Sequence, residues 1–267
     1  MFKRNLLLVS GYFFCSELFA NCSENLPQAG MAECEYSAFS VWMSCKHKAA
    51  VLSWATIEQD SGSQNTSNRH TSLDPSAIPL HCQQNSVASY KTGSADYDAG
   101  YLTAIDLFDY DKNVAQQANV MTNIVPQATL FKRFGAWKRT ELLAECYRDE
   151  EGYSPLLILS GVIFGNDLSN DNFSASHGLP KTPDYFWKLI YSESKNSYDA
   201  WIMQNSNSAK IPTLKASRKD LSSLIIVLKS QADEDYLPVI KKLMRVGNDA
   251  TKFEEWVYRS SCHHRKG

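Results

Sequence analysis

The chain has 267 residues, of which 43% are hydrophobic and 21% are charged, and its formal net charge is −2. This composition is that of an ordinary globular protein with a sizeable core, and it excludes recognition of a polyanion through bulk positive charge, so any contact with nucleic acid requires a local patch. No segment after residue 20 reaches about 18 uninterrupted apolar residues, so we expect a soluble mature protein without a membrane anchor.

The first 20 residues have the layout of a secretory signal peptide. Lys3 and Arg4 precede an apolar run from Leu6 to Cys15, and the segment ends at the small residue Ala20. We therefore expect residues 1–20 to be removed and the protein to be periplasmic or secreted.

The cysteines that remain indicate an oxidising compartment. They are Cys22, Cys34, Cys45, Cys82, Cys146 and Cys262. An even number in an exported chain predicts up to three disulfides, whose pairing the sequence leaves open. None of them forms a CxxC pair, so a zinc site is poorly supported.

The N-terminal half predicts a short extension followed by the start of one compact domain. Residues 21–47 are rich in cysteine and weakly periodic, which favours a disulfide-linked extension, and residues 48–267 are assigned to a single domain. Residues 49–59 predict a strand and residues 87–93 a short strand. Residues 113–127 predict a short helix followed by an extended segment that leads to Pro126.

The C-terminal half alternates one clear helix with several strands. Apolar residues recur at helical spacing over residues 135–150, and Gly152 marks the end of that helix. Residues 155–165 form a continuous apolar run suited to the centre of a sheet, and two further strands are expected at 183–192 and 198–205. Residues 217–232 fit either a helix or a strand, and the segment from 233 onward is helical in pattern. The whole predicts an α+β fold.

Six blocks of sequence, in order, point to a known family. They read NRHTSLDPSAIP, YDAGYLTAID, MTNIVPQ, GAWKRTE, LILSGVIFG and LPKTPDYFWKLIYS. Together, over about residues 49–230, they resemble the DNA/RNA non-specific endonuclease family. The resemblance implies a ββα-metal nuclease-like domain with a mainly antiparallel central sheet flanked by helices. It also implies hydrolysis of DNA or RNA that depends on a divalent metal, usually Mg²⁺.

The resemblance also shows where this chain departs from the family. The block from Asp98 to Tyr101 usually reads Asp-Arg-Gly-His, so Ala99 replaces an arginine that stabilises charge on the phosphate, and Tyr101 replaces the histidine that serves as general base. At neutral pH a tyrosine is ordinarily a proton donor rather than a base. The motif is therefore degenerate at two positions.

Other site residues follow from the same resemblance. Asn123 is expected to hold the metal, and Glu141, four residues after Trp137, matches a family glutamate. Arg133 stands eight residues before that glutamate, where the family has an asparagine, and could supply the charge that Ala99 lacks. We assign Tyr101, Glu141 and Arg133 to catalysis, and Arg69 and Asp98 to substrate binding.

Each of these residues also has a structural interpretation. Tyr101 could be a packed aromatic with a hydrogen-bonded hydroxyl, Asn123 a turn residue, and Glu141 a partner of Lys138. The leading hypothesis is an exported, metal-dependent endonuclease with an altered site. The alternative is a catalytically silent relative that binds nucleic acid or another partner. Oligomeric state and the preference between DNA and RNA are left open.

Overall fold

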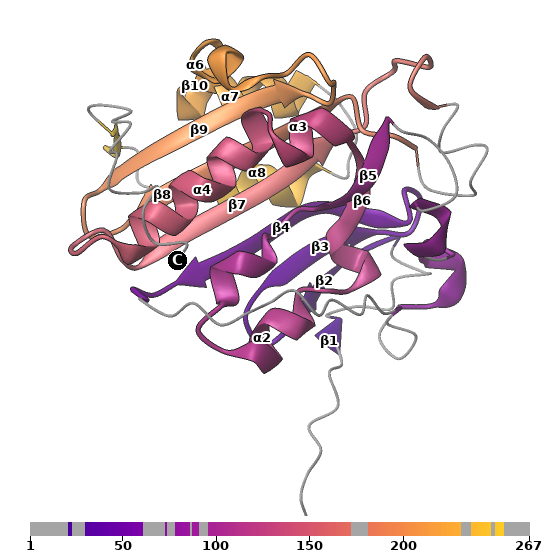
Figure 1. Cartoon of the computed structure of the whole chain (residues 1–267), viewed down its shortest axis with the longest axis horizontal. Helices are drawn as coiled ribbons and strands as arrows, with labels where there is room; N and C mark the ends of the chain where they lie inside the picture. Colours follow the sequence, from indigo (N-terminus) through magenta and orange to yellow (C-terminus); the bar gives the residue numbers. More distant parts are fainter. Residues whose placement is uncertain are drawn as a thin grey trace, which may run out of the picture.

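The structure is a computed structural model of the whole chain. It describes residues 21–22, 30–60, 73, 78–85, 87–90, 96–171, 181–230, 236–246 and 249–253. Within them, the fold is organised by one large sheet and one small one (Figure 1).

The large sheet has nine strands in the order β1-β2-β3-β4-β7-β8-β9-β10, and β11 lies beside β9. Every pairing is antiparallel except that of β11 with β9. The bounds are β1 Asn21–Cys22, β2 Met31–Glu35, β3 Ser40–Ser44, β4 Ala49–Ile57, β7 Leu156–Ile163, β8 Tyr185–Ser192, β9 Ser197–Gln204, β10 Arg218–Lys219 and β11 Thr251–Lys252.

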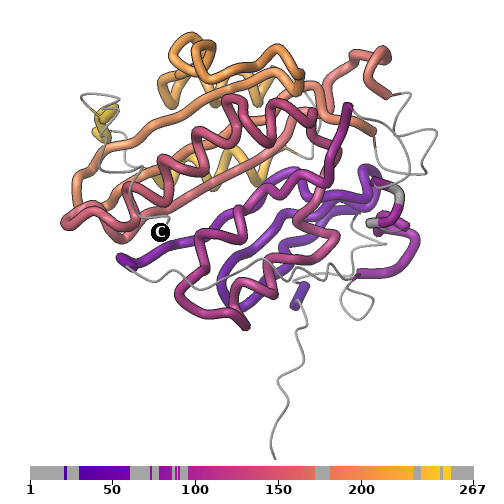
Figure 2. Tube along the Cα trace, in the orientation of Figure 1, coloured from indigo at the N-terminus to yellow at the C-terminus, as the bar shows by residue number. Residues whose placement is uncertain are grey.

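Helices cover both faces of this sheet, as Figures 1 and 2 show. One face carries α3 (Thr129–Arg133) and α4 (Ala136–Asp149), and the Trp137 ring of α4 packs 5.1 Å from the ring of Phe186 on β8. The other face carries α7 (Leu221–Ser230) and α8 (Leu237–Leu243), and the amine of Lys242 lies 3.8 Å from the ring centre of Trp54 on β4. Because both faces of β7 are covered, its sequence is a near-continuous apolar run.

The small sheet is a ribbon of two strands, β5 (Tyr97–Tyr101) and β6 (Ile124–Ala128). Its register pairs Tyr101 with Ile124 and Asp98 with Gln127. Gly100 is required here, because a Cβ atom at that position would overlap the side chain of Gln127. The ribbon is followed by α3 and α4, so the block from Asp98 to Tyr101 belongs to an arrangement of two strands and helices.

The remaining elements are short. They are α2 (Lys112–Gln117), α6 (Leu214–Ser217) and five 3-10 turns, η1 (Leu80–Cys82), η2 (Val87–Tyr90), η3 (Ile105–Phe108), η4 (Met121–Asn123) and η5 (Ile211–Thr213). No helix in the described part of the chain is long and apolar enough to cross a membrane.

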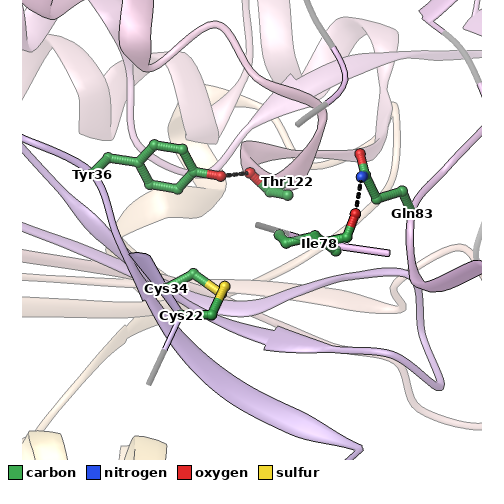
Figure 3. The surroundings of a disulfide bond; sticks show 6 residues. All are labelled: Cys22, Cys34, Tyr36, Ile78, Gln83 and Thr122. Carbon is green, nitrogen blue, oxygen red and sulfur yellow. Dashed lines mark hydrogen bonds between the residues drawn. A yellow bond between two sulfur atoms is a disulfide. The ribbon is translucent and has the colours of Figure 1, made fainter. Parts of the chain in front are cut away.

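The N-terminal segment lies within the sheet rather than beside it. Residues 21–47, predicted as an extension, supply β1, β2 and β3 to the large sheet. Disulfides join Cys22 to Cys34 and Cys45 to Cys82, and Cys146 is also disulfide-bonded. Close to the first of these, the hydroxyl of Tyr36 lies 2.6 Å from that of Thr122 (Figure 3). The segment therefore supports η4, which precedes β6.

Most of the expected elements are present, and the structure decides the form of two segments, residues 217–232 and residues 87–90. The ambiguous stretch at 217–232 forms the helix α7, which buries Leu224 and Leu228 one turn apart and exposes Ile226. The short strand expected at 87–93 is instead the 3-10 turn η2. That turn is held by Tyr90, which is buried against Met121 and Ile124 and donates its hydroxyl to Gln84. Tertiary packing of one aromatic side chain overrides the local pattern.

Candidate active site

The block from Asp98 to Tyr101, predicted to be a degenerate family motif, lies on β5 beside the short helix α3. The amine of Lys132 donates a hydrogen bond of 2.5 Å to the backbone oxygen of Ala99 and lies 5.5 Å from the centre of the Tyr101 ring. A lysine from a different element therefore lies next to Ala99, where the resemblance expects an arginine. Sequence reasoning missed Lys132, although its position directly before Arg133 was an available signal.

Tyr101 is half-buried and hydrogen-bonded. Its hydroxyl donates to Oδ1 of the buried Asn119 at 2.7 Å, and its ring packs against the small apolar cluster that contains Met121 and Ile124. Tyr101 is thus a packed aromatic residue with a hydrogen-bonded hydroxyl, which is the structural alternative that the sequence left open. Its catalytic role stays a prediction, and Asn119 is a neighbour that sequence reasoning did not identify.

Asn123 is completely buried, and its amide is used by the backbone. Its Oδ1 accepts from the amide N–H of Thr103 at 2.9 Å, and its Nδ2 donates to the carbonyl oxygens of Thr103 and Ala118, both at 2.9 Å. These bonds fix the strand end at Tyr101 against the loop before η4. A hydrated metal ion needs an oxygen that faces a space it can enter, so this geometry gives the predicted metal role of Asn123 no support.

Arg133 and Asp98 form a two-pronged ion pair. Nε and Nη2 of the guanidinium donate to the two carboxylate oxygens at 2.7 and 2.8 Å. The hydrogen bond to Asp98 raises the pKa of the Arg133 side chain. The structure therefore brings together two predicted site residues, one from each of β5 and α3, and the Arg133 side chain remains 56% exposed.

Glu141 lies on the first half of α4 and is engaged at both oxygens. Oε1 accepts from the indole N–H of Trp137 at 3.0 Å, and Oε2 lies 3.3 Å from the amine of Lys138. Lys138 also approaches Asp106 at 3.7 Å. Spacings of three and four residues place these groups on one face of the helix, so the predicted ion pair with Lys138 is present.

Behind Glu141 lies a second lysine that sequence reasoning missed. Lys188 of β8 is buried, and its amine lies 3.9 Å from the centre of the Trp137 ring. Burial lowers the pKa of Lys188 to about 8, although Glu141 acts in the opposite direction. A single lysine inside the apolar strand from Tyr185 to Ser192 was the signal that could have revealed it.

Lys138 behaves differently from Lys188. Burial lowers the pKa of Lys138, but the carboxylates around it, above all that of Glu141, outweigh burial and leave the pKa raised. At neutral pH Lys138 is therefore a firm positive charge beside Glu141. Arg69, the remaining predicted site residue, lies outside the described residues.

Comparison with known proteins identifies the family. Residues 20–233 match the family described as DNA/RNA non-specific endonuclease. The chain belongs to this family. No curated protein matches the chain in sequence.

A solved structure with the same fold is described as "Crystal structure of the EndoG/EndoGI complex: Mechanism of EndoG inhibition". A chain of that structure superposes with a TM-score of 0.58 at 16% sequence identity, over 72% of this chain and 81% of that one. At this identity the likeness establishes the fold, which is the ββα-metal nuclease-like fold predicted from the sequence. The match of the endonuclease family begins at residue 20, so it includes β1 to β3.

Nucleases of the DNA/RNA non-specific endonuclease family depend on a divalent metal, and three predicted site residues, Asn123, Asp98 and Glu141, have their oxygens engaged by other groups. The amide oxygen of Asn123 faces a backbone N–H, both oxygens of Asp98 face Arg133, and both oxygens of Glu141 face N–H donors. Hard divalent cations require oxygen ligands that are free to point at the ion. Here the same region already contains the positive charges of Arg133 and Lys138.

Proposed function

We propose that the chain binds DNA or RNA at the surface formed by β5, α3 and the start of α4, and that arginine and lysine side chains hold the phosphodiester there in place of a divalent ion. The observation that carries the proposal is the exposure of the Arg133 side chain, 56%, at a position that the resemblance matches with an asparagine of the endonuclease family. A guanidinium fork that binds the carboxylate of Asp98 has the geometry to bind a phosphate in the same way.

The local charge supports this proposal although the whole chain is slightly acidic. Lys132 and Arg133 are consecutive on α3, and both contact β5: Lys132 bonds the backbone oxygen of Ala99, and Arg133 bonds the carboxylate of Asp98. Phosphate contacts of this kind supply most of the non-specific affinity for nucleic acid. A local patch is what the net charge of −2 requires for such binding.

The test is the fluorescence anisotropy of a labelled oligonucleotide mixed with the disulfide-intact protein. We expect binding that is equally strong in EDTA and in Mg²⁺, and a loss of about tenfold in affinity for Arg133→Ala, since one phosphate contact contributes on this scale. Arg245→Ala is the matched control, because Arg245 is exposed and follows α8, the helix that covers the other face of the sheet. An absence of binding, or equal affinities for both variants, would contradict the proposal.

A second candidate is hydrolysis of the phosphodiester by the altered site. It is favoured by the hydroxyl of the half-buried Tyr101, which donates to Asn119 at 2.7 Å, and by the amine of Lys132, which lies 5.5 Å from the centre of the Tyr101 ring. Plasmid and RNA incubated with the protein in Mg²⁺, Mn²⁺ or Ca²⁺ test it. Cleavage that Tyr101→Phe abolishes would support the tyrosine as a catalytic residue, whereas no cleavage above background at high protein concentration would eliminate hydrolysis.

Export belongs to the same proposal. The disulfides Cys22–Cys34 and Cys45–Cys82 support folding in an oxidising compartment. If residues 1–20 form a signal peptide, the exported protein begins near Asn21, and N-terminal sequencing of that protein is the check. An intact N-terminus that begins at Met1 on the exported protein would contradict removal of the segment.

A further inference from the structure

Two exposed apolar side chains lie close to Arg133 in the chain, one on α3 and one on the residue that caps its C-terminal end. Phe134 is 73% exposed and Leu130 is 48% exposed. The backbone N–H of Phe134 donates to the carbonyl oxygen of Leu130 at 3.0 Å, so the two residues are one helical turn apart. Single exposed apolar residues are common on proteins. What distinguishes this pair is that it adjoins the cations Lys132 and Arg133.

The backbone beneath this pair is held firmly by the loop at 205–210. The N–H of Leu130 donates to Oδ1 of Asn207 at 2.8 Å, and the N–H of Ala136 donates to the carbonyl oxygen of Ala209 at 2.9 Å. A Cβ atom at Gly135 would lie 2.6 Å from that same oxygen, so only glycine allows the loop to approach so closely. Phe134 is thus displayed by a backbone that is tied down on both sides.

A third cation lies in the same loop. Lys210 is exposed and directly follows Ala209, whose carbonyl oxygen accepts the N–H of Ala136. Phe134 therefore lies in the chain between Arg133 and Gly135, and the backbone at Gly135 is approached by the loop that carries Lys210. Aromatic rings interleaved with cations are the arrangement with which proteins bind single-stranded nucleic acid, since bases stack on the rings while cations follow the phosphates.

From this arrangement we infer that Phe134 is a stacking platform for an unpaired base, with Leu130 beside it and with Arg133 and Lys210 on the flanking phosphates, so that the chain prefers single-stranded nucleic acid. The inference rests on the proposed binding of nucleic acid and adds the class of ligand. In a duplex both faces of each internal base are covered by neighbouring bases, so the exposed ring can engage a base face only in an unpaired strand.

The experiment compares two labelled probes, an oligothymidylate and a hairpin duplex of equal phosphate number, by fluorescence anisotropy. We expect Phe134→Ala to weaken binding of the oligothymidylate by about 5- to 150-fold, the range for loss of one stacked base, and to leave duplex binding within about twofold. Phe134→Tyr keeps an aromatic face and should retain binding. Ile226→Ala removes an apolar side chain of similar exposure from α7, on the other face of the sheet.

The outcomes separate this inference from the proposed function. If the wild-type protein binds neither probe, both fail, and a partner other than nucleic acid is left for α3. If it binds and Phe134→Ala equals Ile226→Ala, the stacking platform is overturned while nucleic-acid binding stands. An equal loss on both probes would overturn the preference for single strands. Matching melting temperatures of the three variants and the wild type ensure that folding is not being measured.

Discussion

Two arginine–aspartate pairs in this molecule have similar Nε–oxygen distances but differ in how far their side chains are exposed to solvent. Nε of Arg218 donates to Asp199 at 2.6 Å, and Nε of Arg133 donates to Asp98 at 2.7 Å. The side chains of the first pair are 21% and 0% exposed, whereas those of the second are 56% and 18% exposed. The Nε–oxygen distance alone therefore does not distinguish the two pairs, whereas their burial does.

The buried pair ties distant elements together. Asp199 on β9 also accepts the hydroxyl of Tyr147 from α4, and Arg218 donates to the backbone oxygen of Phe253, which follows β11. Removal of either Asp199 or Arg218 would leave the other side chain without its partner in the ion pair. At the exposed pair, solvent can replace either partner, so the guanidinium of Arg133 can turn to a phosphate at low cost.

The largest expected effect is that of Arg218→Ala. The change leaves the buried carboxylate of Asp199 without its cation, which should lower the free energy of unfolding by about 3–5 kcal/mol. Arg133→Ala, the matched change at the exposed pair, should cost about 1 kcal/mol or less. Urea denaturation of both variants at pH 7 measures the difference. Similar losses for the two variants would show that burial does not separate the pairs.

The pH dependence of stability should reveal the buried pair next. Burial raises the pKa of Asp199 from 3.8 to about 6, although Arg218 acts against it. The folded state therefore holds this proton more tightly than the unfolded chain, so the contribution of Asp199 is fully present below about pH 4 and is lost as the pH rises through about 6.

Asp199→Asn removes the titrating group and isolates this effect. The free energy of unfolding of the wild type minus that of the variant, measured in urea at pH 4, 5, 6 and 7, should decrease over this range, as linkage requires. A difference that is constant with pH would show that Asp199 has an ordinary pKa in the folded protein.

At the exposed side, Lys132→Ala should act on binding more than on stability. It removes one cation beside the motif, so oligonucleotide affinity should fall by several-fold and the salt dependence should flatten by about 0.7 in log–log slope for a single strand. Anisotropy titrations at several salt concentrations measure both quantities. Lys229→Ala, an exposed lysine at the end of α7, is the control. An unchanged salt slope would exclude a phosphate contact at Lys132.

The smallest effect is expected for Tyr101→Phe. It removes the hydrogen bond to Asn119 and leaves the packed ring, so the free energy of unfolding should fall by about 1 kcal/mol. Thermal or urea denaturation measures it. No change in stability would argue that the hydroxyl is kept for a reason other than structure, and would strengthen the case for a catalytic role.

The sequence predicted the local elements well because their signals are periodic. The helix α4 follows from apolar residues at helical spacing, and β7 follows from its apolar run. The stretch LIIVL stayed ambiguous because a short apolar run has no period of its own. This stretch is helical in the structure, and the helix buries Leu224 and Leu228, which are one turn apart.

The site was predictable in position but not in its contacts. The six blocks identified the family, and they predict substitutions of its motif residues at Ala99, Tyr101 and Arg133. No local pattern shows that Arg133 pairs with Asp98, because these residues are far apart in the chain and meet only when α3 packs on β5. The same holds for Asn123, whose backbone hydrogen bonds occupy the amide that the resemblance assigned to a metal.

The measurement that tests the central claim most directly is the affinity of wild-type protein and of Arg133→Ala for one labelled oligothymidylate, each in EDTA and in Mg²⁺. If side-chain cations hold the phosphodiester, the wild-type affinity is the same in both buffers and Arg133→Ala loses about tenfold in both. Binding that appears only with Mg²⁺, and that Arg133→Ala leaves unchanged, would contradict the claim and would indicate that a metal ion holds the phosphodiester.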